Sequence, residues 1–135
     1  MTALVLDASA AVRIVVGPRP EEIVTALESA EDVIAPSLFA EEAANALWKY
    51  VHTGVLAPSD AVRRVRTALS LPNRLLPVSN DESFLAEVFN EACRVDHPVY
   101  DLIYFVTARR NGATLATCDH RLAALASSHG VPVIT

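Results

Sequence analysis

Two aspartates stand directly after short apolar runs that predict β-strands. Asp7 follows the run Ala-Leu-Val-Leu at 3–6, and Asp119 closes the run Thr-Leu-Ala-Thr-Cys-Asp at 114–119. In an open parallel sheet, ligands bind beyond the carboxyl ends of the strands, so acids at these points are candidates for a functional site. For either aspartate taken singly, a cap on the helix that follows is the favoured explanation, and neither by itself establishes a functional site.

A third acid lies on a predicted helix over residues 37–52. At about 100° per residue, Glu42 borders the apolar stripe of this helix, whereas Glu41 falls about 180° from the centre of the stripe and is expected in solvent. Asn45 lies three residues beyond Glu42 on the same surface and is able to hydrogen-bond Glu42 or a neighbouring carboxylate. Glu42, supported by Asn45, is therefore the candidate from this helix.

A fourth acid, Asp101, heads a predicted helix over residues 101–111. The residues three, four and seven positions further on are Tyr104, Phe105 and Ala108. The carboxylate of Asp101 therefore lies at the head of a stripe that faces the core. Capping of the helix explains this aspartate equally well, because an acid is favoured in the first turn.

The four candidate acids account for most of the net negative charge of the chain. Eleven Lys and Arg against sixteen Asp and Glu give a net charge of −5. If the four acids converge, each pair at about 4 Å repels by about 4 kcal/mol at an effective dielectric of 20, so a cation must compensate them. Carboxylate oxygens without His or Cys suit Mg²⁺, with Mn²⁺ as a substitute. The expected metal ligands and catalytic residues are Asp7, Glu42, Asp101 and Asp119.

A divalent cation at such a site activates water and stabilises charge that develops on a phosphate, so the predicted chemistry is phosphodiester hydrolysis. Ser9, two residues after Asp7, is a candidate to hold a water or a phosphate oxygen, although a role at the start of a helix fits it equally well. Ten of the eleven basic residues are Arg, which favours bidentate contact with phosphate. The arginines considered for this contact are Arg13, Arg63, Arg64, Arg66 and Arg109.

Length and composition predict one domain spanning residues 1–135. The chain is 52% hydrophobic, which supports a sizeable buried core. A net charge of −5 provides no strongly basic field for nucleic acid or a membrane surface. Cys93 and Cys118 lie far apart without a CxxC pattern, so we expect a reducing cytoplasm rather than disulfides or zinc. Asp7 and Arg13 interrupt the apolar N-terminus, and no run of about 18 apolar residues exists, so neither secretion nor membrane spanning is expected.

Strand and helix patterns alternate along the chain, which is typical of a parallel α/β sheet sandwiched between helices. The predicted strands cover 3–6, 33–35, 75–78, 114–117 and 131–134. The predicted helices cover 9–16, 21–30, 37–52, 59–69, 81–94, 101–111 and 121–128. Apolar runs such as 4–6 and 76–78 indicate strands buried on both faces. Ser79 and Glu82 have the spacing of a capping box.

Four fragments of the sequence carry a family resemblance in their order and spacing. They are Leu-Val-Leu-Asp-Ala-Ser at 4–9, the segment 36–47 with its Glu42-to-Asn45 step, Tyr-Asp-Leu-Ile-Tyr at the start of 100–112, and Leu-Ala-Thr-Cys-Asp-His-Arg-Leu at 115–122. In these fragments the chain resembles PIN-domain proteins, specifically the VapC-type toxin ribonucleases of type II toxin–antitoxin modules. The resemblance spans nearly the whole chain.

This resemblance implies a parallel sheet sandwiched by helices, a divalent-metal site built from the same four acids, and endonucleolytic cleavage of RNA. It also implies a homodimer, a small VapB-type antitoxin whose tail covers the site, and transfer or ribosomal RNA as the target. Thr117, two residues before Asp119, matches the family pattern and is implied to help orient a water at the metal.

Other functions are less well supported by the residues. No Gly-rich phosphate loop, GxSxG elbow or HxxxH pair is present, and the four histidines are expected at the surface. A metal-dependent phosphatase or phosphotransfer domain would also gather acids at strand ends. It is disfavoured because no DxD begins at Asp7 and because Lys49, mid-helix, is not clearly placed for catalysis. A catalytically inactive PIN-like binding module is disfavoured because all four acids are present.

Overall fold

A five-stranded parallel sheet forms the centre of the computed structural model, which describes residues 3–78 and 81–135. The strand order is β3-β2-β1-β4-β5. The strands are β1 (Ala3–Leu6), β2 (Asp32–Pro36), β3 (Arg74–Leu76), β4 (Thr114–Ala116) and β5 (Val133–Ile134). The helices are α1 (Ala8–Val16), α2 (Glu21–Ser29), α3 (Phe39–His52), α4 (Pro58–Ser70), α5 (Glu82–Val95), α6 (Val99–Arg110) and α7 (His120–Ser128). The prediction of a parallel α/β sheet is confirmed.

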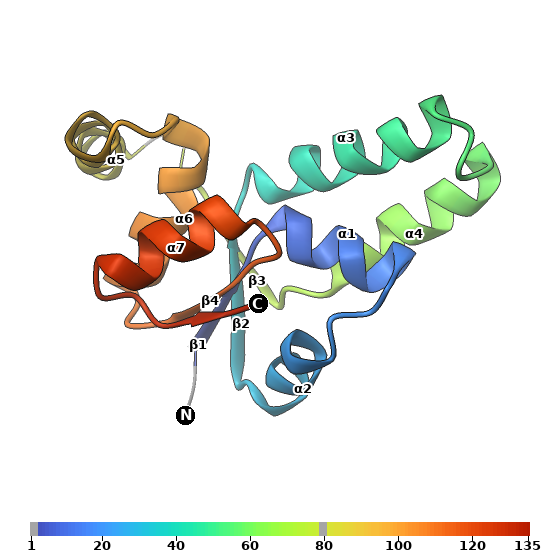
Figure 1. Cartoon of the computed structure of the whole chain (residues 1–135), viewed down its shortest axis with the longest axis horizontal. Helices are drawn as coiled ribbons and strands as arrows, with labels where there is room; N and C mark the ends of the chain where they lie inside the picture. Colours follow the sequence, from blue (N-terminus) through green and yellow to red (C-terminus); the bar gives the residue numbers. More distant parts are fainter. Residues whose placement is uncertain (1–2, 79–80) are drawn as a thin grey trace.

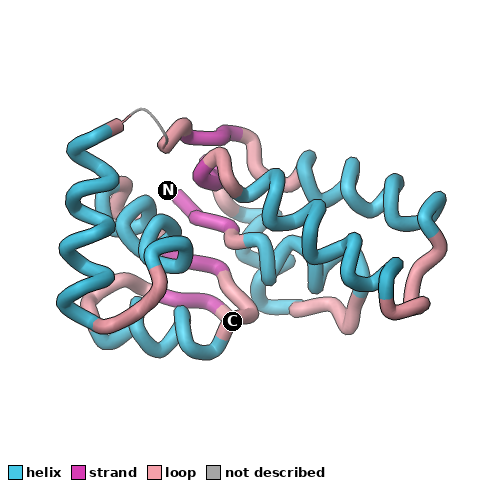
Figure 2. Tube along the Cα trace, turned by 90° about the horizontal axis from the view of Figure 1, so that it is seen from above, coloured by secondary structure: helices cyan, strands magenta, loops and turns pink. Residues whose placement is uncertain are grey.

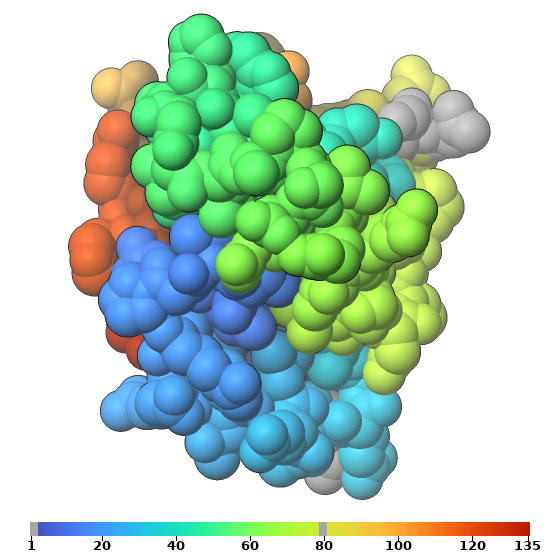
Figure 3. Space-filling view, turned by 90° about the vertical axis from the view of Figure 1, so that its right-hand side faces the viewer, coloured from blue at the N-terminus to red at the C-terminus, as the bar shows by residue number. Residues whose placement is uncertain are grey.

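Helices cover both faces of the sheet (Figures 1 and 2). Alternate residues of a strand point to opposite faces, so Leu4 and Leu6 pack with α1–α4 while Val5 packs with α5–α7. The helices on the first face also contact one another. Figure 3 shows the green surface of α3 and α4 against the blue surface of α1, and a small apolar cluster of Val12, Ala43 and Leu47 lies between them. The predicted sandwich is therefore correct.

The edge strand β3 differs from its prediction. The strand covers 74–76 rather than 75–78, and in the run 76–78, expected to be buried on both faces, only Val78 is buried, whereas Leu76 is partly buried and Pro77 is exposed. β3 pairs only with β2 and lies at the edge of the sheet, so its side chains have neighbours on one side alone. The strand ends before Pro77, which has no N–H to donate to a neighbouring strand.

Six of the seven helix starts lie one or two residues from their predicted positions, among them those of α6, α5 and α3. α6 begins at Val99, directly after Pro98, so Asp101 is the third residue of the helix rather than its cap. The predicted capping box at α5 is wrong: Asp81 caps this helix by accepting a hydrogen bond from the backbone N–H of Phe84. Ser79 lies outside the described residues. α3 begins at Phe39 rather than at residue 37.

The topology brings three chain segments to one edge of the sheet. β1 and β4 are adjacent and parallel, so their carboxyl ends lie side by side, and α1 and α7 begin just beyond them. β2 pairs with β1 on its other side and leads into α3. Among the residues that the structure describes, no helix combines the length and the apolar character needed to cross a membrane.

Candidate active site

The four acids singled out from the sequence line a single pocket of about 290 Å³. They come from four elements: the ends of β1 and β4, the first turn of α6, and the pocket-facing side of α3. The pocket therefore lies at the carboxyl edge of the sheet, where the parallel topology predicts a ligand site. Its other polar lining side chains are Ser9, Asn45, Lys49 and Tyr104. The roles of the acids in metal binding and catalysis stay predictions.

Asp7 both caps α1 and lines the pocket. Its Oδ1 accepts hydrogen bonds from the backbone N–H of Ala10 at 2.9 Å and from the hydroxyl of Ser9 at 2.7 Å. Its Oδ2 accepts one from the hydroxyl of Thr117. Capping and pocket lining, considered above as alternatives for this residue, therefore occur together.

The hydroxyls of Ser9 and Thr117 are themselves held by the loop after β4. The backbone N–H of Cys118 donates to Ser9 Oγ at 3.0 Å, and that of Asp119 donates to Thr117 Oγ1 at 2.9 Å. Each hydroxyl thus accepts from the loop and donates to Asp7. The arrangement makes both residues anchors for the Asp7 carboxylate, and a further role in orienting a water or a phosphate stays a prediction.

The pKa of Asp7 is raised from 3.8 to about 6. Burial is the main cause, because Asp7 is only 4% exposed and a charged carboxylate loses its hydration there. The negative charge of Asp119 raises the pKa further, whereas hydrogen bonds from Thr117, Ala10 and Ser9 lower it. Asp7 therefore ionises at a cost that a nearby cation would offset.

Glu42 projects from α3 into the same pocket. Burial raises its pKa, and the charges of Asp101 and Glu41 add to the effect. The hydroxyl of Tyr104 donates to Glu42 Oε1 at 2.6 Å, which opposes the rise. Burial, together with this bond, raises the pKa of Tyr104 far above neutral pH, so the phenol stays protonated and remains a donor. Glu41 is exposed, as the helical-face prediction required.

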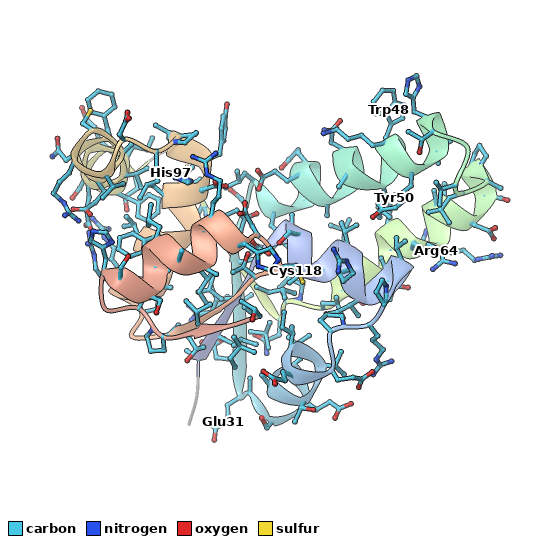
Figure 4. All side chains as sticks on the ribbon, viewed as in Figure 1. Glu31, Trp48, Tyr50, Arg64, His97 and Cys118 are labelled. Atoms are coloured by element: carbon cyan, nitrogen blue, oxygen red, sulfur yellow. The ribbon has the colours of Figure 1, made fainter. Side chains whose placement is uncertain are left out.

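Asp101 is held by a histidine one helical turn before it. The Nε2 of His97 donates to Asp101 Oδ2 at 2.8 Å. The side chain of His97 is only 7% exposed, so the expectation that it lies at the surface is wrong. Figure 4 shows His97 close to the start of α6. His97 precedes Pro98, and its bond to Asp101 ties the connection between α5 and α6 to the first turn of α6.

Asp119 caps α7 with one carboxylate oxygen. Its Oδ1 accepts from the backbone N–H groups of Arg121 at 2.9 Å and Leu122 at 3.2 Å. Asn45 lines the pocket as predicted, but within residues 3–78 and 81–135 it makes no side-chain hydrogen bond to Glu42 or to another carboxylate. Asn45 therefore remains available to a ligand.

The donor set fits a hard divalent cation. In the described part of the chain, Glu42 Oε2, Asp101 Oδ1 and Asp119 Oδ2 accept no protein hydrogen bond, and no Cys or His lines the pocket. Oxygen ligands of this kind suit Mg²⁺ and Mn²⁺. Across the described residues, however, no three side chains are already arranged to hold a metal ion. A shared cation would have to draw the carboxylates closer together.

Sequence reasoning missed three residues of this site. Tyr104 was assigned to the core, His97 to the surface and Lys49 to a helix position without a role. Lys49 lines the pocket. Two of these had a usable signal: His97 lies four residues before Asp101, and Lys49 lies seven residues after Glu42, both spacings that place side chains on one helical face. The contact between Tyr104 and Glu42 had no signal, because 62 residues separate them.

Three of the five arginines considered for phosphate contact are engaged elsewhere. Arg63 pairs with Asp60, and Arg64 donates to the backbone carbonyl of Val15. Arg109 pairs with Glu87 and Glu91 of α5, neither of which lines the pocket. Arg13 and Arg66 are exposed.

Together, the sheet order and the pocket define an α/β protein with an all-oxygen acidic site beyond the carboxyl ends of β1 and β4. Comparison with known proteins gives the family. The PIN domain model matches residues 4–135, so the chain belongs to the PIN domain family. PIN domains are nucleases that hydrolyse phosphodiester bonds.

Individual relatives agree with this assignment. Ribonuclease VapC3 of Pyrobaculum aerophilum is 31% identical over 121 residues, which cover 89% of this chain and 92% of that protein. Ribonuclease VapC12 of Mycobacterium tuberculosis is 33% identical over 127 residues, which cover 94% and 92% respectively. The crystal structure of PAE2754 from Pyrobaculum aerophilum matches with a TM-score of 0.74 at 26% identity, over 98% of this chain and 83% of that one.

Proposed function

We propose that this protein is a divalent-metal-dependent endoribonuclease, with Mg²⁺ as its physiological ion, that acts as the toxin of a type II toxin–antitoxin module. The observation that carries the proposal is the single pocket lined by Asp7, Glu42, Asp101 and Asp119 in a PIN-domain chain. The names of the two VapC relatives support RNA as the substrate.

Some residues of the site orient the four carboxylates, and the carboxylates themselves would bind the cation. Ser9, Thr117 and the amide of Ala10 fix Asp7, Tyr104 fixes Glu42, and His97 fixes Asp101. Hydrogen bonds thereby orient Asp7 through both of its carboxylate oxygens, and Glu42 and Asp101 through one oxygen each. Groups that hydrogen-bond to metal ligands generally orient the ligands in this way. Glu42, Asp101 and Asp119 each keep one oxygen for the ion.

When bound, the cation would lower the pKa of the attacking water and neutralise charge on the phosphate. Among the carboxylates that would hold the cation, Asp7 and Glu42 have raised pKa values. Binding of the cation at neutral pH should therefore displace protons from these two residues. The hydrolysis needs no nucleophile from the protein itself. A role for Ser9 or Thr117 as a nucleophile is disfavoured because both hydroxyls are committed to Asp7.

The position of Lys49 removes one reason given above against a phosphatase, since this lysine does line the pocket. Membership of the PIN family still favours the nuclease. The proposal further includes a homodimer in the cytoplasm, inhibition by a VapB-type antitoxin, and transfer or ribosomal RNA as the target, all on the basis of the likeness to VapC-type ribonucleases.

Incubation of a mixed-sequence RNA with the purified protein tests the proposal. We expect cleavage in Mg²⁺ that EDTA abolishes, with internal products on a sequencing gel rather than trimmed ends. A small phosphate monoester should remain intact. Hydrolysis of the monoester with intact RNA would favour the phosphatase, and no turnover of any RNA or ester would favour the inactive binding module.

A further inference from the structure

The outer part of α3 carries both the only lysine and the only tryptophan of the chain. Glu42, Asn45, Lys49 and His52 follow one another at steps of three and four residues, so they form one ridge along the helix. The first three line the acidic pocket. His52 is the last residue of the helix, and the ridge therefore leads out of the pocket toward the far end of α3.

An aromatic pair stands at that far end. The ring of His52 stacks on Trp48 with 4.9 Å between the ring centroids and 17° between the planes. Trp48 is 56% exposed, and Figure 4 shows it pointing away from α3 on the outside of the molecule. A large aromatic surface is thus held in a fixed orientation but left open to solvent, next to the path that leads from the pocket.

Lys49 lies between the pocket and this pair, and its charge is free for a ligand. Among the described residues Lys49 forms no ion pair, whereas most of the arginines do. Seven residues of helix separate it from Glu42 by about 10 Å along the axis. Side chains of a helix lean toward its N-terminus, so the lysine reaches back toward the pocket without meeting the acids at its base. The distance between Lys49 and the acids suits contact with a backbone phosphate next to the phosphodiester bond that is cleaved.

We propose that an unpaired RNA strand leaves the pocket along this ridge, with a backbone phosphate on Lys49 and a base stacked on the Trp48–His52 pair. The inference rests on the proposed ribonuclease function and adds to it two contacts for the strand along α3, outside the acids of the pocket. Proteins that bind single strands combine cations for the backbone with aromatic rings for the bases. Bases inside a duplex offer no free face to such a ring, so the RNA must be unpaired on one side of the cleaved bond.

The single tryptophan provides the test in the unmodified protein. A labelled single-stranded RNA is titrated in Ca²⁺, with a gel showing that the RNA stays intact, while label anisotropy and Trp48 emission are followed together. We expect a saturable change in Trp48 emission that parallels binding, and much weaker binding of the same sequence in a perfect duplex. Binding by anisotropy with unchanged Trp48 emission would overturn the stacking.

Two variants with matched controls separate the two contacts. Trp48→Leu should weaken binding about tenfold or more, whereas Phe89→Leu, which removes a similarly exposed aromatic from α5, should not. Lys49→Gln should reduce the slope of log Kd against log salt by about 0.7, whereas Arg66→Gln removes the same charge from α4 and should leave the slope unchanged. Equal effects of a variant and its control would overturn that contact.

Two other outcomes assign these residues differently. If Lys49→Gln tightens Ca²⁺ binding and leaves the salt slope unchanged, Lys49 only balances the carboxylates. Trp48 also lines an apolar groove with Pro58 and Val62 of α4. If Trp48→Leu changes the oligomeric state and not RNA binding, that groove is a protein interface. Binding with the expected changes but without cleavage in Mg²⁺ would refute the proposed activity alone, and cleavage without those changes would refute the ridge alone.

Discussion

Acidic side chains occupy two contrasting regions of this molecule. On the outside of α5 and α6, Glu87 and Glu91 pair with Arg109 at 2.6 and 3.5 Å. The hydrogen bond from Arg109 holds the pKa of Glu87 below its usual range. The hydrogen bond from Arg94, with the charge of Arg109, does the same for the pKa of Glu91. In the pocket, Asp7 and Glu42 have no cationic partner among the described residues, and burial raises their pKa. Carboxylates are thus neutralised by arginines on the surface, whereas those of Asp7 and Glu42 lie in the pocket with no such cation in the part of the chain that the structure describes.

The contrast distinguishes surface carboxylates that form ion pairs within the protein from pocket carboxylates that are suited to bind a cation. Exposed ion pairs contribute little to stability because water and salt screen them. Buried acids that face one another cost stability, and such groups cluster at functional sites. Folding of this chain tolerates the cost because the donors around Asp7 and Glu42 offset part of it. Four predictions test the contrast, in order of decreasing effect.

Replacement of Asp7 should have the largest effect, a strong loss of RNA cleavage without a loss of thermal stability. Asp7→Asn removes a proposed metal ligand, so we expect RNA cleavage to fall by more than the 10- to 100-fold that loss of an outer partner typically costs. The asparagine keeps an oxygen for Ser9 and Ala10 and presents an amide to Thr117, whose hydroxyl is free to turn. Thermal unfolding in EDTA should show an equal or higher Tm. Cleavage retained at the wild-type rate would refute the assignment of Asp7.

The pH dependence of stability should have opposite signs in the two regions. Because the pKa of Asp7 rises from 3.8 to about 6 on folding, its contribution is fully present below pH 3.8 and is lost as the pH rises through about 6. The loss is about 3 kcal/mol in the metal-free protein. Glu42 adds to it in the same direction. Glu87 and Glu91 contribute stability above pH 4.5 that is lost as the pH falls through their lowered pKa.

Urea unfolding in EDTA across this pH range measures the effect. The Asp7→Asn protein provides the control, because it should lack the loss of stability between pH 4 and 7 that the pKa shift of Asp7 to about 6 predicts. Saturating Mg²⁺ should also remove much of the loss, since the cation favours the ionised carboxylates. A wild-type profile that matches the variant would show that Asp7 ionises normally.

Loss of an outer hydrogen bond should weaken metal binding without unfolding the protein. Tyr104→Phe removes only the hydroxyl that orients Glu42, so we expect Mg²⁺ affinity to fall about 10- to 100-fold by calorimetry. His97→Ala should have a similar effect through Asp101, and His97→Gln, which keeps a donor, should partly restore the affinity. Tyr50→Phe removes a hydroxyl outside the pocket and is the matched control. Equal affinities of the Tyr104 and Tyr50 variants would exclude a positioning role.

Disruption of the surface ion pairs should have the smallest effect. Arg109→Gln breaks the pairs with Glu87 and Glu91, and we expect a loss of at most about 1 kcal/mol in the free energy of unfolding. High salt should abolish even this difference, because the pairs are partly exposed. Binding of RNA should not change. A clear loss of RNA affinity with unchanged stability would restore Arg109 as a phosphate contact.

The sequence by itself determined the architecture and the identity of the acids. Alternating apolar runs and amphipathic helices require a covered parallel sheet, and parallel strands place Asp7 and Asp119 at one edge. The helical face of Glu42 followed from the 3.6-residue period. These features depend on local spacing and on strand direction, both of which the linear order of residues encodes. The errors fell at the ends of elements, for example at β3, which lies at the edge of the sheet, and at the starts of α5 and α6, which Asp81 and Pro98 decided.

Only the tertiary structure decided how the acids are held. Thr117 reaches Asp7 across 110 residues and Tyr104 reaches Glu42 across 62, so no periodicity relates these partners. Burial, which raises the pKa of Asp7, depends on the packing of elements from both halves of the chain. Hydrogen bonds and desolvation act over a few ångströms of space, whatever the distance along the chain, and folding alone sets which groups come that close.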